Sequence, residues 1–176
     1  MIVLVQRVTE ASVRVNDKVV GAVGQGLLAL ICGEPGDTPE TIEKLARKVA
    51  RLRIFSDDAG KMNLSVCDVQ GDVLCVSQFT LAADTRSGNR PSFSKAASPE
   101  EGRRAYEAFV TALRTHGLSC PTGRFGAELK VSLVNDGPAT FWLQLYAKSK
   151  SFSSCGLFER RGVWINKIDP RSINTI

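Results

Sequence analysis

Aliphatic and β-branched residues dominate the first 32 positions, where they form four short runs. The runs cover residues 2–8, 11–15, 18–23 and 26–32. Asn16-Asp17 separates two alternating runs, and a Gly-Gln-Gly turn separates the last two, as in β-hairpins. This pattern predicts a meander of antiparallel strands.

Two later segments repeat their apolar residues at helical spacing. Thr38 can cap a helix that has Pro39 at its first position. Its apolar face would consist of Ile42, Leu45, Ala46 and Val49. Ser98, Pro99 and Glu101 form a capping box with proline at the first position, and Gly117 ends that second helix.

Further strands are expected at residues 72–78, 131–134 and 140–146. A long polar excursion over residues 80–93 follows the first of them, and loops of this length inside compact domains usually carry function. Together these elements predict an α+β fold with a compact antiparallel or mixed sheet and two main helices.

Composition places the chain among globular proteins with a real core. Its 176 residues suit one domain, and 43% of them are apolar while 23% are charged. No apolar run approaches the roughly 18 residues that span a bilayer, and the start lacks the features of a signal peptide. We therefore expect a cytoplasmic protein with no membrane partner.

Charge is unevenly divided along the sequence. Residues 1–147 hold 17 basic and 16 acidic side chains, whereas residues 148–176 hold 6 and 2. The second segment is a basic, serine-containing stretch without helical or strand period. We expect a domain over residues 1–147 and a flexible C-terminal extension over residues 148–176, with a basic arm that touches a phosphate backbone as the alternative.

Residue types that carry familiar chemistry are scarce. The single histidine, His116, falls in the last turn of the second predicted helix, where the helix dipole favours it, so we give it no catalytic role. Five widely spaced cysteines fit neither a disulfide framework nor a zinc site. The sequence therefore predicts no metal site and no cofactor.

Five separated motifs give the sequence its most specific signal. They are MIVLVQRVTEASV at the start, SQFTL at 77–81, GNRPSF at 88–93, GRFGA at 123–127 and NDGPAT at 135–140. In this order the motifs resemble the D-aminoacyl-tRNA deacylase family over residues 1 to about 145. The resemblance implies a homodimer with a β-barrel-like fold that hydrolyses the ester between a D-amino acid and the 3′ end of tRNA.

The same resemblance implies roles for particular residues. The backbone N–H groups of Phe79 and Thr80 would bind the oxyanion, and the 2′-hydroxyl of the terminal adenosine would promote the reaction. Gly137 and Pro138 match a cis-proline element that reaches into the other subunit and excludes L side chains, so glycyl-tRNA should also be cleaved. Arg7 would hold this element in place.

Other residues are expected to support binding. Ser77 and Gln78 would position the ligand, Phe125 would pack near the terminal adenosine or in the core, and Arg86 and Arg90 are candidates for phosphate contact. Ala139 stands where a larger apolar residue is common in the family. Its effect on the chiral pocket is open.

Two other interpretations fit the residues. The chain could be a noncatalytic module that binds the acceptor end of tRNA, or a hydrolase that forms an acyl-enzyme on Thr80 or Ser77. No histidine or lysine is evident beside Thr80 to activate it, which disfavours the acyl-enzyme. The resemblance implies tRNA and a second copy of the chain as partners. Because residues 1–147 are nearly neutral, their bulk charge gives no reason to expect DNA as a partner.

Overall fold

A computed structural model describes residues 1–94 and 96–147. Five strands form one sheet: β1 (Ile2–Val15), β2 (Lys18–Val23), β3 (Gly26–Cys32), β6 (Asp72–Ser77) and β7 (Lys130–Gln144). Strands β4 (Phe55–Ser56) and β5 (Met62–Leu64) form a separate hairpin. The helices are α1 (Pro39–Ala50), α2 (Pro99–Thr115) and the short 3-10 helix η1 (Phe79–Ala82).

The sheet is mixed and curls into a half-barrel. Strand β1 pairs antiparallel with β2, β3 and β7, whereas β3 and β6 run parallel. Residues 119–123 add to the free side of β6, where Cys75 donates its N–H to Pro121 and accepts one from Gly123. The predicted α+β fold with a barrel-like mixed sheet is confirmed.

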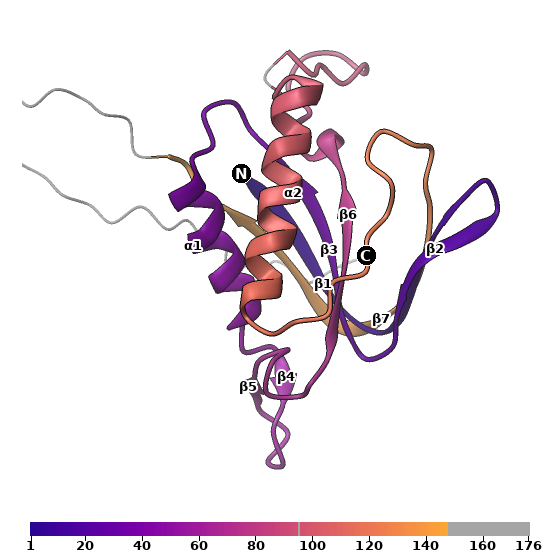
Figure 1. Ribbon diagram of the computed structural model, residues 1–176, viewed down its shortest axis with the longest axis vertical. Coiled ribbons are helices and arrows are strands. Elements are labelled where there is room, and N and C mark those ends of the chain that lie inside the picture. The colour runs from indigo at the N-terminus through magenta and orange to yellow at the C-terminus, as the bar shows by residue number, and fades with distance from the viewer. Residues whose placement is uncertain (95, 148–176) are drawn as a thin grey trace, which may run out of the picture.

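Apolar residues on the two faces of the sheet form two cores. Along β3, Leu27, Ala29 and Ile31 face the larger core, while Leu28 faces the smaller one inside the curl. Helices α1 and α2 lie together on the outer side and cover the larger core (Figure 1). Among the described residues, no helix is long and apolar enough to cross a membrane.

Both helices begin where the capping residues predict. Thr38 accepts a hydrogen bond from Thr41 N, and Ser98 forms a complete capping box with Glu101. His116 is the C-cap of α2, next to Gly117, which has a φ of 81°. The boundaries could be read from the sequence because capping depends on residues only three positions apart.

Two strand predictions were wrong in detail. The runs at 2–8 and 11–15 form one continuous strand, β1. The segments at 131–134 and 140–144 both belong to β7, which ends two residues before the predicted boundary at residue 146. Both strands continue because each pairs with the other over its length. The predicted extension at residues 148–176 lies outside the described residues.

Candidate active site

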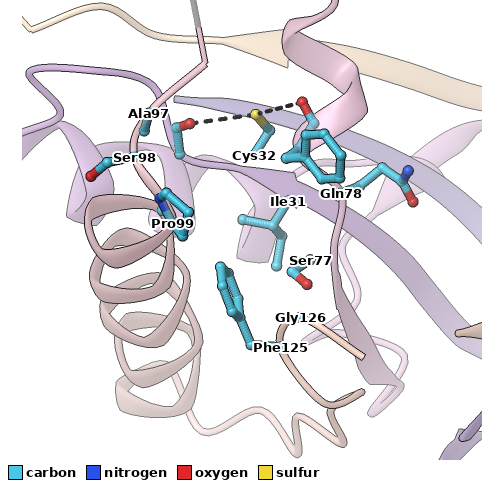
Figure 2. Close-up of a pocket in the computed structure, with 12 residues that line it drawn as sticks. Ile31, Cys32, Ser77, Gln78, Ala97, Ser98, Pro99, Phe125 and Gly126 are labelled. Carbon is cyan, nitrogen blue, oxygen red and sulfur yellow. Dashed lines mark hydrogen bonds between the residues drawn. The ribbon is translucent and has the colours of Figure 1, made fainter. Parts of the chain in front are cut away.

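A cavity of about 290 Å³ opens between the first turn of α2 and the ends of β3 and β6 (Figure 2). Four of the residues singled out in the sequence line it: Ser77, Gln78, Phe79 and Phe125. The remaining lining residues are Ile31, Cys32, Gly33, Ala97, Ser98, Pro99, Gly102 and Gly126. Its volume is near the lower end of the range for small-molecule sites.

Helix η1 forms one wall of the cavity. It starts directly after β6, and its first residue, Phe79, is 61% exposed, with its ring 5.1 Å from that of Phe93. Within residues 1–94 and 96–147, the amide N–H groups of Phe79 and Thr80 have no hydrogen-bond acceptor. The first turn of η1 therefore has two adjacent main-chain donors that remain available to a ligand.

The side chain of Thr80 is occupied by a neighbour. Gln78 Nε2 donates a hydrogen bond of 2.5 Å to Thr80 Oγ1. Thr80 is exposed and does not line the cavity itself. The structure thus brings no general base to this hydroxyl among the described residues, while it holds the Gln78 side chain beside η1.

Cys32 is a pocket residue that the sequence patterns did not indicate. Its sulfur lies 3.4 Å from the carbonyl oxygen of Gly33 and 3.6 Å from that of Phe79, so its single S–H can serve either (Figure 2). Burial, reinforced by the charge of Glu34, raises the pKa of the Cys32 thiol to about 11. The thiol is protonated near neutral pH and is a poor nucleophile.

Close packing between β3 and α2 shapes the other side of the cavity. A Cβ added at Gly33 would lie 2.9 Å from the Cβ of Ala105, so only glycine fits there without a shift. The loop that follows is tied down, since Asp37 Oδ1 lies 2.6 Å and Glu34 Oε2 2.9 Å from the amino group of Met1. Burial raises the pKa of the Asp37 carboxyl.

The Gly137-Pro138 element lies in a gap in the pairing of β1 with β7. Gln6 pairs with Thr140 and Val8 pairs with Asn135, so residues 136–139 of β7 stand opposite Arg7 alone. The Gly137-Pro138 peptide bond is cis, and both residues are exposed. The element therefore projects from the sheet into solvent.

Arg7 of β1 holds the base of this projecting element. Its Nε donates to the carbonyl oxygen of Asp136 at 2.9 Å and lies 2.9 Å from the Asp136 carboxylate, while Nη1 donates to the carbonyl of Ile54. Arg7 is 8% exposed. Gln6 Nε2 also donates hydrogen bonds to the two residues of β7 that flank the gap, to Asn135 Oδ1 at 3.3 Å and to Thr140 Oγ1 at 3.4 Å.

The predicted site residues thus fall into two groups in one chain. Arg7 pairs with Leu27 of β3, whereas the cavity lies at Ile31 and Cys32 of the same strand. Four residues along a strand span about 13 Å. The Gly137-Pro138 element and the cavity are therefore separate within one subunit.

The other three residues singled out in the sequence, Arg86, Arg90 and Ala139, do not line the cavity. Arg86, a candidate for phosphate contact, donates from Nε to Asp84 at 2.8 Å and also pairs through Nη2, which raises its pKa. Arg90 is exposed. Ala139 is 1% exposed behind the Gly137-Pro138 element.

Residues 4–144 match the sequence model of a family described as D-Tyr-tRNA(Tyr) deacylase. A "D-aminoacyl-tRNA deacylase" of Dinoroseobacter shibae is 60% identical over 80% of this chain and 97% of its own. One from Paraburkholderia phymatum is 57% identical over 84% of this chain and 100% of its own.

Two solved structures are similar in fold. The "c-Myc DNA Unwinding Element Binding Protein" has a TM-score of 0.78 and 40% identity, over 84% of this chain and 100% of that protein. A "probable eukaryotic D-amino acid tRNA deacylase" has a TM-score of 0.70 over 80% of this chain and 97% of its own. At 17% identity, the second likeness concerns the fold alone.

Proposed function

Because this chain belongs to the D-Tyr-tRNA(Tyr) deacylase family, we propose that its cavity is where the ester bond of D-aminoacyl-tRNA is hydrolysed. The chain is a D-aminoacyl-tRNA deacylase by its relatives, an enzyme that releases a free D-amino acid and tRNA. The observation that carries the site is the pair of adjacent main-chain donors at Phe79 and Thr80 without an acceptor in the described part of the chain, at the residue where η1 meets a largely apolar cavity. The substrate implies that the enzyme acts in the cytoplasm.

Main-chain groups do most of the work in this mechanism. Water attacks the acyl carbon, and the N–H groups of Phe79 and Thr80 stabilise the tetrahedral oxyanion, each donor contributing about 2.7–4 kcal/mol. The ester bond then breaks, and the proton from water passes to the 3′-oxygen of the terminal adenosine. The neighbouring 2′-hydroxyl, which the substrate supplies, assists this transfer. An activated ester needs no strong protein base, which suits a site whose nearest thiol, Cys32, is protonated.

Ligand binding uses the other walls of the cavity. Ser77 and Gln78 position the aminoacyl group, and Phe125 packs against the terminal adenosine. Arg7 fixes Asp136, and so the Gly137-Pro138 element, through its hydrogen bonds. The element excludes an L side chain at the α-carbon because rigid backbone occupies the space that this side chain would need.

We propose that this exclusion works across a homodimer. In one chain the element and the cavity are too far apart to meet, while a two-fold axis would bring each element to the partner's cavity. Strand β7 offers the matching surface: within the described part of the chain its outer edge pairs with no strand, and its exposed apolar side chains are Leu133, Val134 and Trp142. Long apolar strand edges are commonly buried in natural proteins.

Sedimentation equilibrium tests the dimer. The native mass should be twice the 19.1 kDa of the chain. Val134→Asp places a charge on the exposed face of β7. It should give monomers that no longer discriminate D-aminoacyl-tRNA from L-aminoacyl-tRNA. Val19→Asp is the matched control, because Val19 is 53% exposed on β2 and should leave the dimer intact. A monomeric wild-type protein that still rejects L substrates would refute the proposal.

The activity itself is tested with matched tRNA esters. We expect release of D-tyrosine from D-tyrosyl-tRNA, hydrolysis of glycyl-tRNA, and a rate at least roughly 10²-fold lower with L-tyrosyl-tRNA. A chain that ends at Ala147 should behave identically if residues 1–147 carry the function. Ester that persists in both D and L samples would favour a noncatalytic RNA-binding module instead.

DNA binding is a second candidate, favoured by the name of the solved protein at 40% identity. The near-neutral charge of residues 1–147 gives no electrostatic reason to prefer DNA. We therefore expect excess single-stranded DNA to leave hydrolysis of D-tyrosyl-tRNA unchanged. Inhibition at a DNA concentration equal to that of the tRNA would establish DNA as a competing ligand.

A further inference from the structure

The rim of the cavity holds a charged side chain that the proposed hydrolysis does not use. Arg103 belongs to the first turns of α2, and its Cζ lies 4.9 Å from the centre of the Phe125 ring. Phe125 lines the cavity, so only the thickness of this ring separates the guanidinium group from the cavity. Arg103 itself is exposed to solvent.

The ring beneath Arg103 is held firmly. Phe125 lies 6.0 Å from the ring of Tyr106 at an angle of 45°, and Tyr106 is anchored by a 2.9 Å hydrogen bond from its hydroxyl to the carbonyl of Cys75. Gly102 lies next to the ring as well, because a Cβ there would be in ordinary contact with Phe125 Cζ at 3.8 Å. A guanidinium group stacked on a fixed aromatic ring keeps its orientation and its charge.

The N–H donors of Arg103 remain available to a ligand. In residues 1–94 and 96–147, no carboxylate or carbonyl oxygen accepts a hydrogen bond or forms an ion pair with this guanidinium. The carboxylate of Glu101, two residues before Arg103 on α2, is engaged by the Ser98 hydroxyl at 2.9 Å, in the capping box. Arg86 differs, because Asp84 occupies its donors.

We infer that Arg103 contacts a backbone phosphate of the CCA end of the substrate. This inference rests on the proposed function. If the aminoacyl group and terminal adenosine fill the cavity, the preceding nucleotide must cross the rim, where the planar donor fork of Arg103 matches a phosphate. The contact is far from the reacting ester, so it stabilises the bound substrate and the transition state equally.

Arg103→Ala should therefore raise KM for D-tyrosyl-tRNA roughly three- to tenfold and leave kcat unchanged. With D-tyrosyl-adenosine, an ester that has no phosphate, the same variant should match wild type. Loss of one phosphate contact should also reduce the slope of log affinity against log salt by about 0.7. Arg103→Lys should recover part of the affinity because it keeps the charge.

Arg104→Ala is the matched control, since Arg104 is the next residue of α2, is exposed and carries the same charge. An equal loss in both variants would mean a general effect of charge and would overturn the inference. Weaker hydrolysis of D-tyrosyl-adenosine by Arg103→Ala would also overturn it, because Arg103 would then act only by positioning Phe125.

Binding measurements separate this inference from the proposed function. The dissociation constant of a short RNA ending in CCA can be measured for wild type and variants without any hydrolysis. If wild type fails to cleave D-tyrosyl-tRNA, the proposed function fails. The phosphate contact then stands if Arg103→Ala still weakens RNA binding with the smaller salt slope, and falls if it does not.

Discussion

Phe79→Pro is expected to lower kcat for D-tyrosyl-tRNA by about 10²–10³-fold, the usual effect of removing one oxyanion donor. Proline lacks the N–H that Phe79 would present to the oxyanion, but its φ suits the first position of a helix. A proline disfavours helical backbone angles at the residue before it. Gln78, the preceding residue, has a φ of −146° and a ψ of 76°, which is not helical, so its conformation is compatible with a proline at position 79. The wall should keep its shape and lose one donor.

Phe79→Ala is the control for the lost ring. It removes the contact with Phe93 but retains the N–H, so it should lower kcat far less than Phe79→Pro. Single-turnover hydrolysis under saturating enzyme measures both variants directly. Equal losses in the two variants would mean that the ring, and not the main-chain donor, supports the reaction.

Thr80→Ala distinguishes this mechanism from an acyl-enzyme. The variant keeps the main-chain N–H and loses only the hydroxyl that accepts from Gln78. It should retain most of the activity, and no covalent adduct should be trapped in the wild-type enzyme. Complete loss of turnover together with a trapped ester on Thr80 would support covalent catalysis.

Arg7→Ala is expected to lower the free energy of unfolding by about 2–4 kcal/mol and to weaken the rejection of L-tyrosyl-tRNA. The change leaves the carbonyls of Asp136 and Ile54 without their donor and the Asp136 carboxylate without its partner. Solvent weakens the ion pair, because the Asp136 side chain is 43% exposed, so this range lies below that of a fully buried pair. Denaturant unfolding gives the first quantity, and the ratio of D to L hydrolysis gives the second.

Two comparisons sharpen the Arg7 experiment. Arg14→Ala removes an exposed arginine from the same strand and should change neither stability nor selectivity. Arg7→Lys keeps the charge but lacks the fork that reaches both carbonyls, so it should recover only part of the stability. A destabilised Arg7→Ala protein with undiminished rejection of L-tyrosyl-tRNA would restrict Arg7 to a structural role.

The cavity and its rim hold residues that no sequence pattern indicated. Cys32 ends an apolar run and looked like one more core residue, yet its sulfur contacts the carbonyl of Phe79 in the cavity wall. Arg103 lies among other charges on a helix face. Neither position differs from an ordinary core or surface site until Phe79 and Phe125 are placed beside them, so a single sequence could not single them out.

The sequence alone determined the features that depend on residues a few positions apart. Capping at Thr38 and Ser98 requires only neighbours within one turn. The five motifs likewise sufficed for the family, because their order is a property of the chain. Their roles in the site stay predictions until the variants above are measured.

Only the tertiary structure decided which of these motifs meet. Arg7 and Asp136 are 129 residues apart, and whether they touch depends on the register between β1 and β7. The same register leaves residues 136–139 opposite a single residue, which turned two expected strands into one strand with a projecting element. Register comes from the summed packing of both sheet faces, so no local pattern could fix the distance between this element and the cavity.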